Sequence, residues 1–206
     1  KAAEPSMKNQ PEWPPTASRA ALKSRAQQSF FVRGFFAQRD VLEVETPILG
    51  RCGVTEPNLD SISANSSAQG VEGGWLQTSP EYHMKRLLAA GSGSIYQISK
   101  VFRNGERGSR HNPEFSMLEW YRTGFDDETL MKEVADLVCG WLECPRPRVI
   151  SYRQAMNDWA GIDPFVITKS DLHQRCREWL QPEQLQNLSR DGCLDLLMSF
   201  AVEPNL

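Results

Sequence analysis

Residues 94–122, SIYQISKVFRNGERGSRHNPEFSMLEWYR, decide the fold class of this chain. Residues 94–103 and 114–122 each alternate between apolar and polar side chains, which predicts two strands. The charged, glycine-containing residues 105–113 predict a connecting loop, so the two strands form a hairpin and run antiparallel. Because apolar helical patterns precede and follow this hairpin, we predict an α+β fold in which an antiparallel β-sheet is flanked by helices.

Two helices are predicted before the hairpin. Ser18 can cap a helix over residues 18–39, whose apolar side chains recur at four-residue spacing, and we expect that helix to be well covered. Ser79, Pro80 and Glu81 form a helix start, with a capping hydroxyl, a proline in the first turn and an early acid. This second helix should end near Gly91.

Strand and loop patterns lie between these two helices. Residues 41–47 alternate and end in a proline, which predicts a strand that stops there. Residues 50–74 are rich in Gly, Ser and Asn and predict a long loop or a poorly ordered hairpin. Residues 75–78 are a short strand candidate.

Helices are also predicted after the hairpin. An apolar stripe after Asp126 predicts a helix whose core-facing residues are Leu130, Val134, Leu137, Val138 and Trp141. Shorter helices are expected at residues 152–159, 170–180 and 191–201.

Length and composition indicate one soluble domain. The chain has 206 residues, and its first 17, rich in proline and charge, predict an extended lead-in to a domain over residues 18–206. The net charge of -3 gives no large basic surface for nucleic acid. Five cysteines without a CxxC pair argue against a disulfide framework or a zinc site, and no apolar run approaches the about 20 residues of a membrane span. We therefore expect a cytoplasmic protein with reduced thiols, no membrane contact and no metal site of its own.

The second hairpin strand places chemically useful groups on one face. A period of two puts Phe115, Glu119 and Tyr121 on the same side. Arg103 comes just before the connecting loop and His111 lies within it. Since an arginine fork matches phosphate oxygens and a flat ring suits a nucleobase, this end of the hairpin can hold ATP.

Each of these residues also has a simpler role. An alternating strand with one buried acid is more often ordinary sheet than an active site. Glu81 suits the first turn of a helix because of the helix dipole. His83 and His111 are each more often structural histidines. Longer motifs must therefore decide between the two interpretations.

Three longer segments carry a specific resemblance. VLEVETP at 41–47 resembles class II motif 1, TSPEYHMKRLL at 78–88 resembles a substrate-binding segment, and residues 102–121 resemble motif 2. Over residues 20–206 the chain is similar to the catalytic domain of class II lysyl-tRNA synthetases. It is more similar to their short paralogues, the elongation factor P lysine ligases. His83 and Met84 favour this paralogue over a standard synthetase. The resemblance implies a class II synthetase sheet and a homodimer interface built by motif 1.

The resemblance also assigns roles by position. Arg103 is implied as the catalytic residue at the α-phosphate of ATP, and Phe115 stacks on adenine. The other implied nucleotide-binding positions are Asn104, Gly105, Glu106, His111 and Asn112. The implied binding residues for the substrate, lysine or β-lysine, are Ser79, Pro80, Glu81, Glu119 and Tyr121. Mg²⁺ and arginine offset the phosphate charge, and carboxylates in a partly dry pocket suit an ammonium group.

The sequence departs from the family pattern in two places. Motif 2 of the family begins Phe-Arg-Asn-Glu, whereas Gly105 follows Asn104 here and the acid comes one residue later, at Glu106. Glu106 can replace it if the loop shifts. A glycine-rich motif 3, with its second ATP-binding arginine, does not occur up to Leu206. We therefore expect a catalytic domain that is incomplete at its C-terminus and has weak or no activity by itself.

Three functions remain open at this point. The preferred one is an ATP-dependent ligase that makes a lysyl or (R)-β-lysyl adenylate and transfers the acyl group to a lysine side chain of elongation factor P. About twenty residues precede the motif 1 helix, too few for an anticodon-binding barrel, so tRNA is not an expected partner. The alternatives are the catalytic domain of a lysyl-tRNA synthetase and a non-catalytic paralogue that binds an amino acid or a partner protein. The residue types do not distinguish α-lysine from β-lysine.

Overall fold

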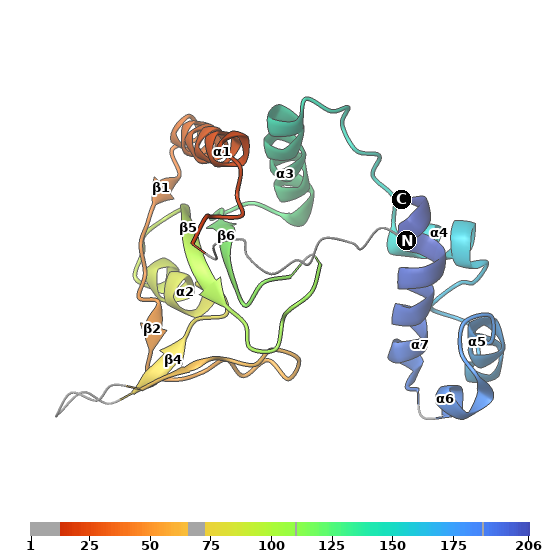
Figure 1. Ribbon diagram of the computed structural model, residues 1–206. Coiled ribbons are helices and arrows are strands. Elements are labelled where there is room, and N and C mark those ends of the chain that lie inside the picture. The colour runs from red at the N-terminus through yellow and green to blue at the C-terminus, as the bar shows by residue number, and fades with distance from the viewer. Residues whose placement is uncertain (1–12, 66–72, 110, 187) are drawn as a thin grey trace, which may run out of the picture. The chain divides into compact units, whose positions relative to one another are not determined.

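The computed structural model describes residues 13–65, 73–109, 111–186 and 188–206. The chain divides into two compact units, Lys1–Arg146 and Pro147–Leu206, each of which is described by itself (Figure 1). Most of the predicted lead-in, residues 1–17, lies outside the described residues. One catalytic domain over residues 18–206 stays a prediction.

A three-stranded sheet forms the centre of the first unit. In spatial order its strands are β1 (Leu42–Glu43), β5 (Ile95–Phe102) and β6 (Glu114–Tyr121). β5 and β6 pair antiparallel along their whole length, with Gln97 opposite Glu119. Together with the surrounding helices, this hairpin confirms the predicted α+β fold.

The pairing of β1 differs from the prediction in direction and length. β1 runs parallel to β5, so the sheet is mixed rather than purely antiparallel. It spans two residues instead of the predicted 41–47. The reason is that the chain soon leaves this sheet, since the Ile48 carbonyl accepts a 2.9 Å hydrogen bond from the Gln77 amide on the way into a second sheet.

The helix α1 (Arg19–Ala37) packs on one face of the central sheet. It begins as predicted, because the Ser18 hydroxyl accepts a 3.1 Å hydrogen bond from the Ala21 amide. The ring of Phe36 is fully buried and stacks on Tyr96 of β5 at 4.4 Å between centroids. The expectation that the helix is well covered was wrong: only one stripe of it is buried, and Phe30 is 82% exposed.

The helix α3 (Asp127–Leu142) packs beside α1 (Figure 1) through only part of the predicted stripe: Leu137 is buried, and the Trp141 ring lies 5.7 Å from the ring of Phe31 on α1. Val134 and Val138 are exposed at 37% and 43%, whereas Glu133, Ala135 and Leu137 are buried. The buried face is turned toward Glu133 because that carboxylate has polar partners on the sheet.

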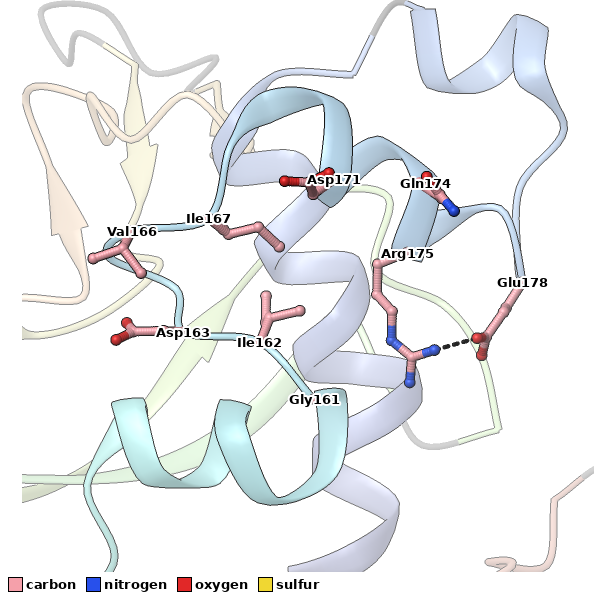
Figure 2. A pocket seen from close by; sticks show the side chains of 9 residues that line it. All are labelled: Gly161, Ile162, Asp163, Val166, Ile167, Asp171, Gln174, Arg175 and Glu178. Atoms are coloured by element: carbon pink, nitrogen blue, oxygen red, sulfur yellow. Dashed lines mark hydrogen bonds and ion pairs between the residues drawn. The ribbon is translucent and has the colours of Figure 1, made fainter.

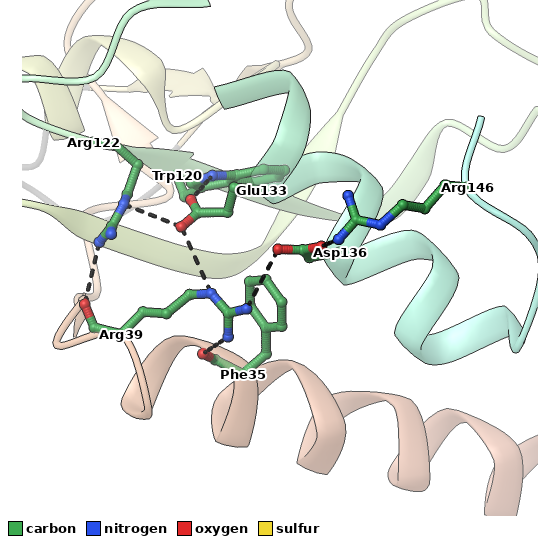
Figure 3. Close-up of polar contacts among 7 residues, drawn as sticks. All are labelled: Phe35, Arg39, Trp120, Arg122, Glu133, Asp136 and Arg146. Atoms are coloured by element: carbon green, nitrogen blue, oxygen red, sulfur yellow. Dashed lines mark hydrogen bonds and ion pairs between the residues drawn. The ribbon is translucent and has the colours of Figure 1, made fainter. Parts of the chain in front are cut away.

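Glu133 is the centre of a polar network (Figure 3). Its carboxylate accepts a 3.1 Å hydrogen bond from the Trp120 indole and lies 3.2 Å from Nε of Arg122. Nε of Arg39 approaches the same carboxylate at 3.9 Å, and the Arg39 carbonyl accepts from Arg122. Because a buried charge is costly unless it is paired, these contacts fix α3 against both β6 and the end of α1.

A second, smaller sheet involves the stretch predicted as a long loop or a poorly ordered hairpin. Its order is β2 (Leu49–Gly50), β4 (Gly74–Leu76), β3 (Ser63–Ala64), and both pairings are antiparallel. Residues 66–72 lie outside the described part of the chain. The strand predicted at 75–78 corresponds to β4, which is followed by α2 (Glu81–Ala89), the predicted second helix.

The second unit is helical and has its own core. Its elements are α4 (Tyr152–Ala155) with the π-helical turn Met156–Ala160, α5 (Lys169–Cys176), α6 (Pro182–Gln186), and α7 (Arg190–Leu197) with the turns Met198–Val202 and Glu203–Asn205. The three helices predicted here are present, and α6 was not anticipated. Fully buried side chains such as Met156, Leu172 and Leu197 pack together in its centre.

Two further expectations concern the chain as a whole. All five cysteines are free in the structure. Among the helices of the described residues, none combines the length and the apolar character needed to cross a membrane.

Candidate active site

A pocket of about 280 Å³ in the first unit contains part of the predicted substrate site. Ser79 and Glu81 line it, together with neighbouring residues of the second sheet and of the chain before it. The other lining residues are Gly50, Cys52, Gly53, Val54, Glu56, Leu59, Ser61, Trp75, Leu76, Gln77, Thr78, Tyr82 and His83. The start of α2 thus forms one wall of the pocket.

Ser79 makes two hydrogen bonds that join this helix start to the central sheet. Its hydroxyl accepts a 3.0 Å hydrogen bond from the Glu81 amide, which satisfies one free N–H of the first helical turn. The same hydroxyl donates to Glu119 of β6 at 2.7 Å. Pro80 beside it is fully buried, so this turn has little freedom to move.

Glu119 receives a second hydroxyl from its own strand. The Tyr121 hydroxyl donates a 2.6 Å hydrogen bond to the other carboxylate oxygen of Glu119. Burial raises the pKa of Tyr121, and the bond to Glu119 raises it further, so Tyr121 stays a hydrogen-bond donor at neutral pH. Glu119 is therefore a half-buried carboxylate whose orientation is fixed by two hydroxyl groups.

Glu81 already binds an ammonium group. The Lys85 amine lies 2.5 Å from one oxygen of Glu81, one helical turn further along α2. The hydrogen bond to Glu81 raises the pKa of Lys85, which keeps this amine protonated. Both groups are partly exposed, so a competing ammonium from solution can reach the Glu81 carboxylate.

The pocket offers hydrogen-bond acceptors to a ligand. Besides Glu81, the Oε1 atom of Gln77 is buried and has no hydrogen-bond partner within the described part of the chain, while its Nε2 atom donates to the Lys100 carbonyl at 2.9 Å. Glu119 lies just beyond Ser79. A positively charged group with several N–H donors fits these acceptors.

Arg103 and Phe115 lie together next to this pocket. The guanidinium carbon of Arg103 is 5.2 Å from the centre of the Phe115 ring. Nε of Arg103 donates to the Thr78 carbonyl at 3.4 Å, and Nη1 lies 3.6 Å from Glu106. These polar contacts are long, so the fork keeps donor capacity for a phosphate group beside a flat aromatic surface.

The loop after Arg103 is positioned by its backbone. Gly105 has φ +76°, a conformation that favours glycine and accounts for the departure from the family pattern at this position. The Asn104 amide donates to the Asp60 carbonyl at 2.8 Å. His111 and Asn112 are exposed, and within the described residues no side-chain hydrogen bond ties either of them to Arg103 or Phe115.

The structure therefore brings together two groups of predicted residues and leaves a third apart. One linked group consists of Ser79, Glu81, Glu119 and Tyr121. The other consists of Arg103, Glu106 and Phe115. The two groups are connected because Arg103 donates to the Thr78 carbonyl, next to Ser79. The loop residues Asn104, His111 and Asn112 lie at the exposed end of the hairpin.

Sequence reasoning missed the wall formed by residues 50–61. The Ser61 hydroxyl stabilises this wall because it accepts a 2.9 Å hydrogen bond from the Val54 amide. The packing here is close, since a Cβ added at Gly53 would lie 3.2 Å from Ser61 Oγ. The hydroxyls of Thr55 and Tyr82 lie 2.9 Å apart and join the wall to α2. Glycine and serine in an irregular segment are the only local signal, and such residues are typical of any loop.

Within the described ranges, no group of three or more His, Cys, Asp or Glu side chains is placed so that it could hold a metal ion.

A hollow of about 590 Å³ in the second unit (Figure 2) is lined by Asp163, Asp171 and Glu178, among others. Glu178 pairs with Arg175, and Asp171 accepts from Thr168. Its acids are therefore already engaged.

Comparison with known proteins gives a family and several relatives. The family described as tRNA synthetases class II (D, K and N) matches residues 14–164. A protein named elongation factor P–(R)-β-lysine ligase from Histophilus somni (strain 2336) is 46% identical over 198 residues, which are 95% of this chain and 61% of that protein. The protein of the same name from Pasteurella multocida (strain Pm70) is 44% identical over 203 residues, 97% of this chain and 62% of that protein. The chain thus spans about three fifths of the length of these relatives.

Proposed function

Because the chain belongs to the class II tRNA synthetase family (D, K and N), we propose that it activates lysine or (R)-β-lysine with ATP and transfers the acyl group to a lysine side chain of elongation factor P. The relatives described above are named for joining (R)-β-lysine to elongation factor P, and they cover 95% and 97% of the chain in the comparison. The activity, the substrates and the acceptor are carried over from proteins longer than this chain.

One observation of the structure supports this function above all others. The carboxylate of Glu119, held by Ser79 and Tyr121, lies beside a pocket that also offers Glu81. Two carboxylates and an unpaired amide oxygen of Gln77 suit an amino acid whose side chain or backbone ends in an ammonium group. Lysine and β-lysine each carry two such groups.

We assign the nucleotide to the neighbouring residues of motif 2. Arg103 would bind the α-phosphate of ATP and Phe115 would stack on adenine, since the two side chains lie next to each other and next to the amino-acid pocket. Asn104, Gly105, Glu106, His111 and Asn112 would contribute from the loop. The phosphates of ATP would supply most ligands of Mg²⁺, because this ion favours substrate phosphates with one or two carboxylates.

The chemistry needs positioning more than a protein nucleophile. The carboxylate of the bound amino acid attacks the α-phosphate of ATP, which gives an aminoacyl adenylate and releases pyrophosphate. The residues of this chain orient the attacking carboxylate and offset the charge that develops on the phosphate. An amine of the acceptor protein then displaces AMP from the adenylate.

The full-length gene product tests this function directly. It is incubated with ATP, Mg²⁺ and either lysine or (R)-β-lysine, with elongation factor P and lysine tRNA offered in parallel. We expect a gain in the intact mass of elongation factor P and no charged tRNA. Charged tRNA without modified protein would instead assign the chain to the tRNA-charging enzymes, and adenylate formation with neither acceptor modified would point to a different acceptor.

We further propose that the enzyme is cytoplasmic and forms a homodimer through α1 and β1. The apolar residues Leu22, Phe30 and Leu42 are 59%, 82% and 58% exposed, and all three lie in these two elements. A dimer would remove them from water. Light scattering of the full-length protein should give twice the monomer mass, and Phe30→Glu should reduce it to that of a monomer.

A further inference from the structure

Two cysteines at the end of α3 lie in direct contact. The sulfur atoms of Cys139 and Cys144 are 3.7 Å apart. We propose that these residues are a modification site, at which the two thiols form a reversible intramolecular disulfide by exchange with a small disulfide such as oxidised glutathione. This proposal does not depend on the function proposed above, because neither cysteine contacts the candidate active site.

The end of the helix brings the two thiols together. Cys139 lies in the last turn of α3, and Glu143 after the helix has φ 52°, a left-handed conformation that turns the chain back. Cys144 therefore folds over the turn that it follows, and Cys139 also contacts the Pro145 carbonyl at 3.4 Å. The sulfur–sulfur bond of a disulfide is about 2.05 Å long, so the two sulfur atoms must come closer together by less than the width of one atom. Rotation of the two side chains can supply this movement.

The surroundings of the two thiols suggest an order of events. Cys144 is exposed and Cys139 is half-buried. Burial, followed by the contact with Cys144, raises the pKa of the Cys139 thiol, so a smaller fraction of it is thiolate. Cys144 is accordingly the attacking thiol, and Cys139 is the thiol that resolves the mixed disulfide.

The exchange is balanced in atoms and electrons. The Cys144 thiolate attacks one sulfur of oxidised glutathione, which forms a protein–glutathione disulfide and releases one glutathione thiolate. The Cys139 thiolate, after losing its proton to solvent, attacks the Cys144 sulfur and releases the second glutathione. The two protein thiols are oxidised, one molecule of glutathione disulfide is reduced to two of glutathione, and an added thiol reverses both steps.

The other cysteines of the chain serve as internal controls. Cys176 and Cys193 are fully buried in the second unit, so a bulky disulfide cannot reach them in the native protein. Cys52 is exposed and belongs to the wall of the candidate active site. Cys52 does not belong to α3 or to the Cys139–Cys144 pair. We therefore expect its reaction with oxidised glutathione to stop at the mixed disulfide.

The position of the pair gives the modification a structural consequence. The first compact unit ends at Arg146, two residues after Cys144. Arg146 pairs with Asp136 of α3, so this segment already rests against the helix. A disulfide between Cys139 and Cys144 would add a covalent bond beside that exposed contact and would hold the chain against α3 where it leaves the first unit.

The test uses the full-length protein in buffers of graded glutathione redox ratio. After acid quenching, free thiols are alkylated with a maleimide and peptides are identified by mass. After tryptic digestion we expect one peptide that contains both Cys139 and Cys144, is 2 Da lighter than its dithiol form and shifts to the dithiol mass after reduction, while Cys176 and Cys193 are alkylated only after denaturation. Cys144→Ser should abolish the link, and Cys52→Ser, the matched control, should leave it unchanged.

Two results would overturn the proposal. One is glutathione on Cys144 without a linked product at any redox ratio. The other is a linked product that forms equally well in denatured protein, since the native turn would then contribute nothing. Circular dichroism of the Cys144→Ser protein excludes unfolding as the cause of a lost link.

Discussion

The hydroxyl of Ser79 donates a 2.7 Å hydrogen bond to the carboxylate of Glu119, although 40 positions separate the two residues in the chain. This bond joins the residues that begin α2 to the second half of β6. Through it, a helix-start motif and a hairpin strand become one site, with Tyr121 holding the other oxygen of the same carboxylate.

The first prediction concerns the charge of Glu119. Glu119→Gln keeps the shape of the side chain but removes the negative charge, so binding of the substrate ammonium should lose about 1.5–3 kcal/mol. That loss corresponds to about a 10- to 100-fold higher KM for lysine or β-lysine. Pyrophosphate exchange on the full-length protein measures it. The control is Glu114→Gln on the same strand, where an exposed carboxylate pairs with Lys100 at 3.1 Å, and its KM should stay at the wild-type value.

The second prediction concerns the planar fork of Arg103. Arg103→Lys keeps the charge but loses the flat contact with Phe115 and the paired donors for phosphate, so kcat/KM for ATP should fall by about 100-fold. Arg107→Lys, an exposed position in the same loop, should have no such effect. If Arg103→Lys retained full activity, the α-phosphate role assigned to Arg103 would be wrong.

The third prediction concerns the buried charge of Glu133. Glu133→Ala leaves Arg122, whose side chain is 12% exposed, without its partner and should lower the free energy of unfolding by about 3–5 kcal/mol. Asp136→Ala one turn away removes a carboxylate that is 34% exposed, and the loss should stay below about 1 kcal/mol. Urea unfolding of both variants gives the comparison. Equal losses would mean that burial of Glu133 adds nothing to stability.

The fourth prediction concerns stability at high pH. Burial, followed by the 2.8 Å hydrogen bond to Glu43, raises the pKa of Tyr96 from the ordinary 10.0 to about 12. Below pH 10 Tyr96 is neutral in both the folded and the unfolded protein. Above pH 10 the unfolded chain loses the Tyr96 proton, while the folded protein keeps it. The free energy of unfolding should therefore fall as pH rises from 10 toward 12, by about 1.4 kcal/mol per pH unit for this one group.

Tyr96→Phe isolates that contribution. Urea unfolding at several pH values from 9 to 11.5 should show a shallower decline for the variant than for the wild-type protein. Arg33 and Glu43, which pair at 3.0 Å beside Tyr96, remain in both proteins, so their own titration cancels in the difference. Identical slopes would show that Tyr96 titrates alike in the folded and unfolded states.

Local patterns in the sequence were sufficient for most elements. The alternation over residues 94–122 predicted β5 and β6, the Ser18 cap predicted the start of α1, and Ser79-Pro80-Glu81 predicted the start of α2. These features depend on residues at most four positions apart, or on a strand and its neighbour across one loop. The same local motifs carried the family resemblance.

Features that depend on distant partners were not predictable in this way. The apolar stripe of α3 pointed to Val134 and Val138, yet the helix buries Glu133, because Trp120 and Arg122 on β6 supply its polar partners. The irregular residues 50–61 gave no sign that they would form a wall of the pocket. The contact of Cys139 with Cys144 depends on a left-handed residue after the helix, which helix periodicity does not report.

The sequence by itself thus determined the α+β class, the strand faces and the family of this protein, since periodicity, caps and motif spacing are properties of the chain alone. Only the tertiary structure decided which side chains meet. Ser79 reaches Glu119, and Arg103 reaches both Phe115 and the Thr78 carbonyl, because the packing of α2 and the second sheet against β5 and β6 sets those distances. Such packing is a collective result of many contacts, so no short stretch of sequence records it.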